Sequence, residues 1–206
     1  PVDYEVSEDD IPNTIKLLKH IFKEQYELGL KYFKILYEDP EQILPILVLV
    51  SEERETGKTT FLNLLLFLFA ENTVLISPQA LTHVFNVSYS IKNIVLIDEA
   101  MIDKNTSIEK LKSLATAKVL AVSEKNVNHY SVPFFGKIIL CTNKEKDFMR
   151  IDESEVRFWI RKIHKIEGEI NTAIEKDLYS EIPKFIKYLT QLPPIDKSKS
   201  RMVFTK

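Results

Sequence analysis

Hydrophobic residues recur at helical spacing at both ends of the chain and gather into short unbroken runs between them. Every third or fourth residue is apolar across Thr14–Tyr37, which predicts a helical segment that Gly29 divides in two. Helical spacing returns across Asn171–Leu189, where Pro183 is expected to bend or divide the helix. We therefore expect helices at both ends and a different architecture in the middle.

The central part of the chain alternates short apolar runs, typical of buried strands, with stretches long enough for helices. The predicted strands are Ile46–Val50, Thr73–Ile76, Asn93–Ile97, Lys118–Val122, Tyr130–Pro133, Lys137–Thr142 and Glu155–Ile163. The predicted helices between them are Thr59–Ala70, Pro78–Phe85 and Ser107–Thr116. This alternation predicts a three-layer α/β fold with a central, mainly parallel sheet. The expected divisions are a helical collar at residues 1–40, a core at residues 41–166 and a helical tail with a basic terminus at residues 167–206.

Composition limits the kinds of function without choosing one. Apolar residues make up 45% and charged residues 28% of the chain, the balance of a globular protein with a real core. The net charge of −2 does not by itself indicate a nucleic-acid-binding protein, so such a contact has to come from a local patch or from small patches summed around an oligomer. The single cysteine, Cys141, excludes an internal disulfide, and no Cys/His spacing indicates zinc.

The sequence shows neither a membrane span nor a secretion signal, and the expected location of the protein rests on this. No apolar run is long enough to span a bilayer and no signal peptide opens the chain, so we expect a cytoplasmic protein without a membrane partner. A reducing setting agrees with the single cysteine. The first residue is Pro1 rather than Met, and we expect the chain to be a piece of a longer protein with further domains upstream.

The first candidate for chemistry is the stretch in which a predicted strand, a polar loop and a helix follow one another. Ile46–Val50 leads through the loop to Gly57, Lys58, Thr59 and Thr60. Backbone N–H groups and the N-terminus of such a helix bind phosphate. In this arrangement Lys58 reaches the β- and γ-phosphates of ATP, and the Thr59 hydroxyl holds Mg²⁺. The alternative is a polar turn that caps a core helix.

The loop departs from the complete phosphate-binding pattern in two places. Glu52 stands six residues before the lysine, where the pattern has glycine, and Glu55 stands at another position where glycine is common. Both carboxylates oppose phosphate binding unless they point outward or pair with Arg54. The expected nucleotide-binding residues are Glu55, Thr56, Gly57, Lys58, Thr59 and Thr60.

Two further predicted strands end in polar residues suited to nucleotide hydrolysis. Asn93–Ile97 is followed by Asp98 and Glu99, of which Asp98 is expected to orient Mg²⁺ through water and Glu99 to polarise the attacking water as general base. Lys137–Thr142 is followed by Asn143, whose amide can position that water. Taken singly, these are an acidic strand end in solvent and a turn asparagine. Together with the lysine they predict one site, because the ends of parallel strands meet at one edge of a sheet.

These motifs together resemble those of superfamily 3 helicases, the compact AAA+-type motors of viral and plasmid replication, and most closely the helicase domain of phage and provirus primase-helicases. The resemblance covers roughly Ile43–Ile166. The matching segments are Val50-Ser51-Glu52, Thr56-Gly57-Lys58-Thr59-Thr60-Phe61-Leu62, Leu96-Ile97-Asp98-Glu99-Ala100 and Arg157-Phe158-Trp159. It implies an AAA+-type P-loop NTPase with ATP and Mg²⁺ as ligands, assembled as a hexameric ring with ATP bound between subunits.

The resemblance also implies a role for Arg157 at the start of the last predicted strand. Such an arginine reaches the γ-phosphate held by the neighbouring subunit as an arginine finger, and a surface salt bridge is the alternative. Alternation along the strand divides the side chains into a core-facing set, Val156, Phe158 and Ile160, and an opposite set, Arg157, Trp159 and Arg161. Arg161 and Lys144 are the second choices for a phosphate sensor. Cys141 is expected to serve packing, as is Trp159, for which an interface or stacking on adenine is the alternative.

A second site comes from the same resemblance. Helicases of this family carry a hairpin that projects a basic residue into a central pore, and the corresponding segment here is Ser123–His129. Lys125 is expected to contact a DNA phosphate, with His129 close to it. Without the resemblance, a solvated turn is the simpler interpretation. Six copies of one lysine around a pore make a weak phosphate contact significant.

These expectations combine into an ATP-dependent single-stranded DNA translocase or helicase module of a replication protein, acting as a homo-oligomeric ring beside an upstream polymerase or primase domain. The alternative is a nucleotide-binding ring scaffold, or clamp, for that polymerase, with little or no ATP turnover, which the replaced glycines favour. A protein-remodelling ATPase is a third possibility, with Tyr130 as the one aromatic residue near the expected pore.

Overall fold

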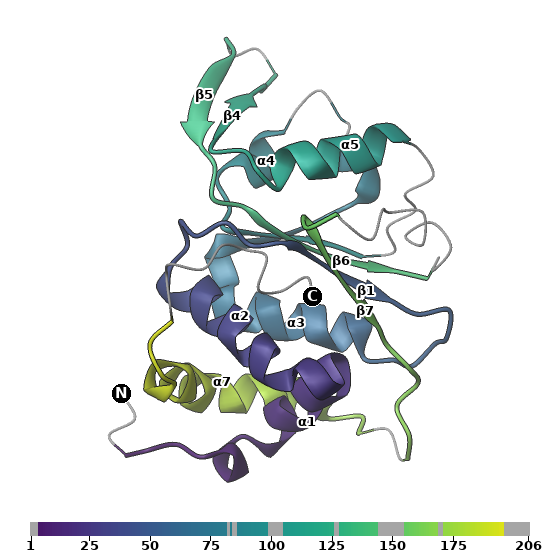
Figure 1. The fold of residues 1–206 in the computed structure, drawn as a ribbon, viewed down its shortest axis with the longest axis vertical. Coiled ribbons are helices and arrows are strands. Elements are labelled where there is room, and N and C mark those ends of the chain that lie inside the picture. The colour runs from purple at the N-terminus through teal and green to yellow at the C-terminus, as the bar shows by residue number, and fades with distance from the viewer. Residues whose placement is uncertain are drawn as a thin grey trace.

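A five-stranded parallel sheet forms the centre of the protein, with helices on both faces (Figure 1). The computed structural model describes residues 4–81, 83, 86–98, 105–125, 128–143, 155–168 and 171–195. In spatial order the strands are β2 (Thr73–Ile76), β3 (Ile94–Ile97), β6 (Lys137–Thr142), β1 (Ile46–Val50) and β7 (Phe158–Lys162). All neighbouring pairs are parallel, so the strands end at the same edge. The predicted parallel sheet is confirmed, and β1, β2 and β6 have the predicted bounds.

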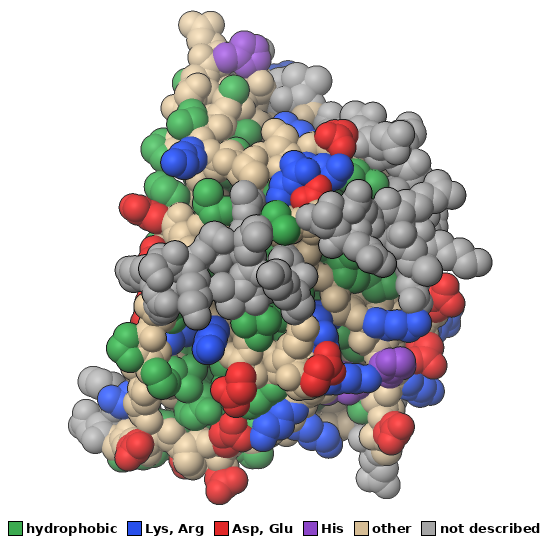
Figure 2. All heavy atoms as spheres, in the orientation of Figure 1, with side chains coloured by type: hydrophobic (Ala, Val, Ile, Leu, Met, Phe, Trp, Pro, Cys, Tyr) green, Lys and Arg blue, Asp and Glu red, His purple; other side chains and the backbone are tan. Residues whose placement is uncertain are grey.

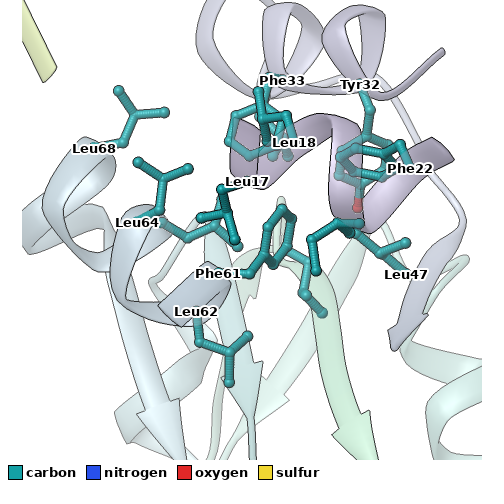
Figure 3. Close-up of a cluster of buried hydrophobic side chains, with 14 of the residues drawn as sticks. Leu17, Leu18, Phe22, Tyr32, Phe33, Leu47, Phe61, Leu62, Leu64 and Leu68 are labelled. Carbon is teal, nitrogen blue, oxygen red and sulfur yellow. The ribbon is translucent and has the colours of Figure 1, made fainter. Parts of the chain in front are cut away.

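The helices on one face come from both ends of the chain and from the segment after β1. They are α1 (Pro12–Phe22), α2 (Tyr26–Glu38), α3 (Lys58–Phe69) and α7 (Ile174–Gln191), with 3-10 turns at Glu8–Asp10, Lys23–Gln25 and Ala70–Asn72. Their apolar side chains form one cluster with alternate strand residues. Figure 3 shows Leu17 of α1, Phe61 of α3 and Leu47 of β1 converging within this cluster, which we call the helical-face core. Whether residues 1–40 and 167–206 act as separate collars stays a prediction.

The opposite face is covered by shorter elements. They are the 3-10 helix η4 (Pro78–Leu81), α4 (Val87–Ser90) and α5 (Asn105–Leu114). Of the predicted helix Pro78–Phe85, the structure describes only the 3-10 turn to Leu81, and most of the remainder lies outside the described residues. Beyond α5, β4 (Val119–Val122) and β5 (Tyr130–Pro133) pair as the predicted antiparallel hairpin, which projects from the body of the molecule (Figure 1). Across the described residues no helix is both long and apolar enough to cross a membrane.

The prediction that Gly29 divides the N-terminal helical segment was wrong. The N-terminal helices separate at Lys23, whose φ is +46°, rather than at Gly29, which lies inside α2. A Cβ at Gly29 would lie 2.4 Å from Cδ2 of Phe22, so the glycine allows close approach of the Phe22 ring instead of breaking the helix. At the other end of the chain, α7 runs through Pro183 without being divided, and a bend at Pro183 stays a prediction.

The side chains of β7 alternate between the two faces as predicted, with Phe158 in a core, but the expectation that only the Phe158 face is buried was wrong. Trp159 is 3% and Arg161 8% exposed, whereas Ile160, expected in the core, is 40% exposed. The Trp159 ring stacks on Phe22 at 5.2 Å between centroids and its indole N–H donates to Gln25. The error arose because the helical face, not the face that Phe158 contacts, holds the larger core. Trp159 and Cys141 are buried packing residues, as predicted.

Candidate functional site

The loop between β1 and α3 has the backbone conformation of a tight phosphate cradle. Gly57 has a φ of +79° and immediately precedes α3, and a Cβ there would lie 3.2 Å from Cδ1 of Ile166. Glu55 also has a positive φ, +57°, a region that glycine adopts at least cost. The chain therefore keeps a turn of glycine type at Glu55 although the residue there is not glycine.

Lys58 is the first residue of α3 and folds back beneath this loop. Its Nζ lies 3.2 Å from Oγ1 of Thr56 and 3.4 Å from the carbonyl oxygen of Ser51, and the residue is only 8% exposed. Burial lowers the pKa of Lys58, an effect that the nearby Cys141 and Asp98 oppose. Among the described residues no carboxylate forms an ion pair with it. A buried ammonium group at a helix N-terminus with only neutral oxygen partners is suited to an anion.

The predicted meeting of three strand ends is confirmed by the order of the strands. β6 lies between β1 and β3, with Val50 opposite Thr142 and Ile97 opposite Leu140. The Thr59 hydroxyl donates to Oδ2 of Asp98 at 3.3 Å, which joins the start of α3 to the end of β3. Asn143 follows β6 and is exposed at the same edge. Lys58, Thr59, Asp98 and Asn143 are thus brought together, while Glu99 lies outside the described residues.

The acidic residues of the loop are held by the segment that follows β7. Lys165 forms a 2.8 Å ion pair with Glu55 and donates its backbone N–H to Oε2 of Glu53. The Ile166 N–H donates to the carbonyl oxygen of Glu55 at 3.1 Å. The hydrogen bond from Lys165, with its charge, lowers the pKa of Glu55. The partner of Glu55 is therefore Lys165 and not Arg54, the partner that the sequence analysis considered.

A cavity of about 580 Å³ opens beside the same loop, between α1, the segment after β7 and the start of α7. Gly57 and Thr60 form one wall, and His20 reaches the carbonyl oxygen of Thr56 with Nε2 at 3.1 Å. Its basic lining residues are Lys16, His20, Lys23, His164 and Lys165. None of the five was predicted from the sequence. The spacing of 16, 20 and 23 on one helix face was a usable signal, but nothing local pointed to residues 164 and 165.

Arg157 lies far from the strand-end site of its own chain. It precedes β7, and Phe158 is opposite Ile46 at the start of β1, whereas Lys58 lies beyond the end of β1. The five residues of β1 span roughly 16 Å. The Arg157 guanidinium forms a two-point ion pair with Glu155, with Nε 2.6 Å from Oε1. This contact holds the pKa of Glu155 below its usual range.

Of the two second choices for a phosphate sensor, Lys144 lies outside the described residues. Arg161 has a structural role, and that prediction was wrong. Its Nη2 donates to the carbonyl oxygen of Phe22 at 2.7 Å and lies 2.9 Å from a carboxylate oxygen of Glu24. These contacts tie β7 to the junction between α1 and α2. The side chain is committed to the helical face and does not reach the strand-end site.

The hairpin residues expected to contact DNA lie apart from the strand-end site. Lys125 and His129 are both exposed, and positions 126 and 127 between them are outside the described residues. His129 Nδ1 lies 2.8 Å from Oγ of Ser123 across the loop. In the orientation of Figure 1, Figure 2 shows hydrophobic and histidine side chains on this projection.

Comparison with known proteins gives a family and a fold. The sequence model of a family described as a family of unknown function (DUF5906) matches residues 49–161, more than half of the chain. Two apo structures of the NrS-1 C-terminal region are similar, with TM-scores of 0.80 and 0.78 at 23% sequence identity. Each match covers 96% of this chain and 48% of the other, so the chain spans about half the length of those structures. At this identity the likeness concerns the fold alone. No curated protein matches the sequence.

Proposed function

The chain belongs to the family of unknown function DUF5906, and we propose that it binds a nucleoside triphosphate with Mg²⁺ and hydrolyses it as the motor module of a DNA replication protein. The family's description assigns no activity, so the proposal rests on the strand-end site. The phosphates would bind at Gly57, Lys58 and Thr59. The nucleoside would occupy the adjoining cavity, whose basic side chains and apolar walls fit a sugar and a base.

One observation carries the proposal: Lys58 is buried at the start of α3 beside the Thr59–Asp98 hydrogen bond. Burying an ammonium group is costly, and two neutral oxygen atoms offset only part of that cost. A phosphate group would complete its coordination. The hydroxyl of Thr59 and the carboxylate of Asp98 are the hard oxygen ligands that Mg²⁺ takes. Bound Mg²⁺ supplies positive charge that neutralises the phosphate oxygens.

The remaining residues have supporting roles in this proposal. The amide of Asn143, at the end of the strand between β1 and β3, would orient a water molecule towards the phosphates. Glu99, next to Asp98 in sequence, is the expected general base. The pairing of Glu55 with Lys165 supports phosphate binding, because it offsets one of the two carboxylates that oppose it.

Ring assembly and single-stranded DNA as partner rest on the resemblance to superfamily 3 helicases. The position of Arg157 at the far edge of the sheet supports a role in a neighbour's site, since it lies too far away to serve its own. The Arg157–Glu155 ion pair would have to open for that role. The exposed hairpin with Lys125 and His129 would line the ring's pore, and an upstream polymerase or primase domain would be carried by the same longer protein.

A second function, a nucleotide-binding ring scaffold or clamp with little turnover, is favoured by the loop itself. Glu52 occupies the position of the first glycine of the motif. Lys165 and Ile166 fasten the loop to the segment after β7 at Glu53 and Glu55. A loop held this firmly is compatible with binding but limits the rearrangement that turnover requires.

The test is steady-state ATP hydrolysis with and without single-stranded DNA, for the native chain and for Lys58→Ala. Turnover that DNA stimulates and Lys58→Ala abolishes would support the motor. Binding of ATP without turnover would favour the clamp, and absence of both would overturn the nucleotide proposal. Lys31→Ala, which removes an exposed lysine of α2, is the matched control and should match the native chain.

A further inference from the structure

The β4–β5 hairpin carries too little positive charge to hold a polyanion by electrostatics alone. Between Val119 and Pro133 the only acidic or basic side chains are those of Glu124, Lys125 and His129, so the charge of the one lysine is balanced by that of the one glutamate. Each phosphate neutralised on a single strand contributes a salt dependence of only about −0.7 in log affinity per log salt. A nucleic-acid contact here therefore needs an uncharged source of affinity.

The register of the hairpin places an aromatic ring next to its loop. Tyr130 is the first residue of β5 and pairs with Val122, the last residue of β4. Val122 is fully buried, yet Tyr130 remains 40% exposed, and no hydrogen-bond partner of its hydroxyl is recorded within the described residues. A half-exposed tyrosine of this kind has a ring face available to a ligand.

The base of the loop is held in place by a buried side chain from the body. Asn86, 7% exposed, donates from Nδ2 to the carbonyl oxygen of Ala121 at 2.8 Å and accepts from the N–H of Ser123 at 2.9 Å. Ser123 in turn holds Nδ1 of His129. The residue preceding Tyr130 is thus fixed through Ser123 and Asn86, which lowers the entropic cost of presenting the ring.

We propose that Tyr130 binds single-stranded nucleic acid by stacking on a base, while Lys125 and Nε2 of His129 contact the adjoining phosphates. The inference rests on the proposed function, since it takes the hairpin as the nucleic-acid contact, and it adds the residue that supplies most of the affinity. Aromatic stacking is tolerant of sequence because every base has a π-face. Single strands are selected over duplex because their bases are unstacked and accessible.

The experiment is fluorescence anisotropy of a labelled oligothymidine and of the same oligonucleotide made abasic, titrated with the chain in the presence of ATP and Mg²⁺. Tyr130→Ala is expected to weaken binding of oligothymidine by about tenfold or more, and Tyr130→Phe to stay within about twofold of the native chain. On the abasic strand the native chain and Tyr130→Ala should bind alike. Tyr37→Ala, which removes an equally exposed tyrosine from α2, is the control.

Salt dependence separates stacking from charge. The salt slope should be unchanged in Tyr130→Ala and shallower in Lys125→Ala. If the native chain binds oligothymidine and Tyr130→Ala binds it equally well, the stacking role is overturned and the proposed function stands. If the native chain binds neither oligonucleotide, the nucleic-acid part of the proposed function falls, and this inference falls with it.

Discussion

The two faces of the sheet are built in different ways. On the helical face, α1, α2, α3 and α7 share a continuous core with aromatic contacts among Phe22, Phe33, Phe61 and Phe185. On the other face, α4 and α5 cover a smaller core and lead into a hairpin with exposed Val119 and Tyr130. The first face is closed by segments far apart in the sequence, whereas the second ends in a locally folded projection.

Because of this difference, the proposed nucleotide site and the proposed nucleic-acid contact are held in place by different kinds of interaction. The nucleotide site depends on long-range contacts, including His20 with Thr56 and Lys165 with Glu55. The hairpin depends on cross-strand pairs and on Asn86. Changes on the helical face should therefore alter stability and nucleotide binding together. Changes in the hairpin should alter nucleic-acid binding without unfolding the chain.

The largest loss of stability is expected when the contact between α7 and the start of α1 is removed. Buried Glu181 accepts four hydrogen bonds, from the backbone N–H groups and side chains of Asn13 and Thr14. Glu181→Ala leaves these donors unsatisfied and should lower the free energy of unfolding by about 3 kcal/mol in urea denaturation. Glu175→Ala, which removes an exposed acceptor on the same helix, should cost less than about 0.5 kcal/mol. Equal losses in the two variants would contradict the account.

A comparable effect on stability, dependent on pH, is expected at Lys137, which connects segments from the two faces of the sheet. Nζ of Lys137 donates to the carbonyl oxygens of Pro40, after α2, and Phe135, after the hairpin. Burial lowers the pKa of Lys137 to about 8 from its ordinary value of 10.5. Between those values the unfolded chain binds more protons, so stability attributable to this group rises as the pH increases.

Denaturation of the native chain and of Lys137→Met at pH 8 and pH 10.5 measures this contribution. The native chain should gain on the order of 2–3 kcal/mol relative to the variant over that interval. A difference that stays constant with pH would show that the amine is not depressed in the folded state.

A somewhat smaller effect is expected from Gly29→Ala, because the added Cβ meets the buried ring of Phe22 at 2.4 Å. Overpacking should outweigh the better helix propensity of alanine and destabilise by about 2 kcal/mol in thermal or urea denaturation. Gly168→Ala is the matched comparison, since a Cβ there meets nothing within 4 Å and only the φ of +90° opposes it. A stabilised Gly29→Ala variant would mean that α1 and α2 are less closely packed.

The smallest effect on stability is expected at the loop, where binding should change instead. The Lys165–Glu55 pair is exposed to solvent, so Lys165→Ala should leave the free energy of unfolding nearly unchanged. Nucleotide affinity should nevertheless fall a few-fold, because the carboxylate of Glu55 loses its counter-charge. Titration calorimetry of Lys165→Ala and of the double variant with Glu55→Gln checks this. Failure of Glu55→Gln to restore affinity would place that carboxylate away from the phosphates.

The sequence predicted those parts of the fold that short-range patterns determine. The strands β1, β2, β5 and β6 were found with their bounds, because each is an apolar run limited by polar residues. The convergence of Lys58, Asp98 and Asn143 followed from their positions at the ends of parallel strands. The hairpin followed from two such runs around a polar turn.

The wrong and missing predictions concern residues whose role is determined by contacts with segments distant in the sequence. Gly29 leaves room for the Phe22 ring of the neighbouring helix, and Arg161 is held at the junction between α1 and α2. Lys165 reaches Glu55 across more than a hundred residues of sequence. No periodicity or local motif encodes such a partner. The structure places Lys58, Thr59, Asp98 and Asn143 together, but the roles of all the predicted site residues remain predictions.

The decisive measurement is the affinity for Mg·ATP, determined by titration calorimetry with the native chain, Lys58→Ala and Lys31→Ala. We expect the native chain and Lys31→Ala to bind with equal affinity, and Lys58→Ala, shown to be folded by circular dichroism, to lose affinity by at least about tenfold, the equivalent of about 1.4 kcal/mol. Equal affinity of a folded Lys58→Ala variant, or no binding by the native chain, would contradict the assignment of the phosphate site to Gly57, Lys58 and Thr59.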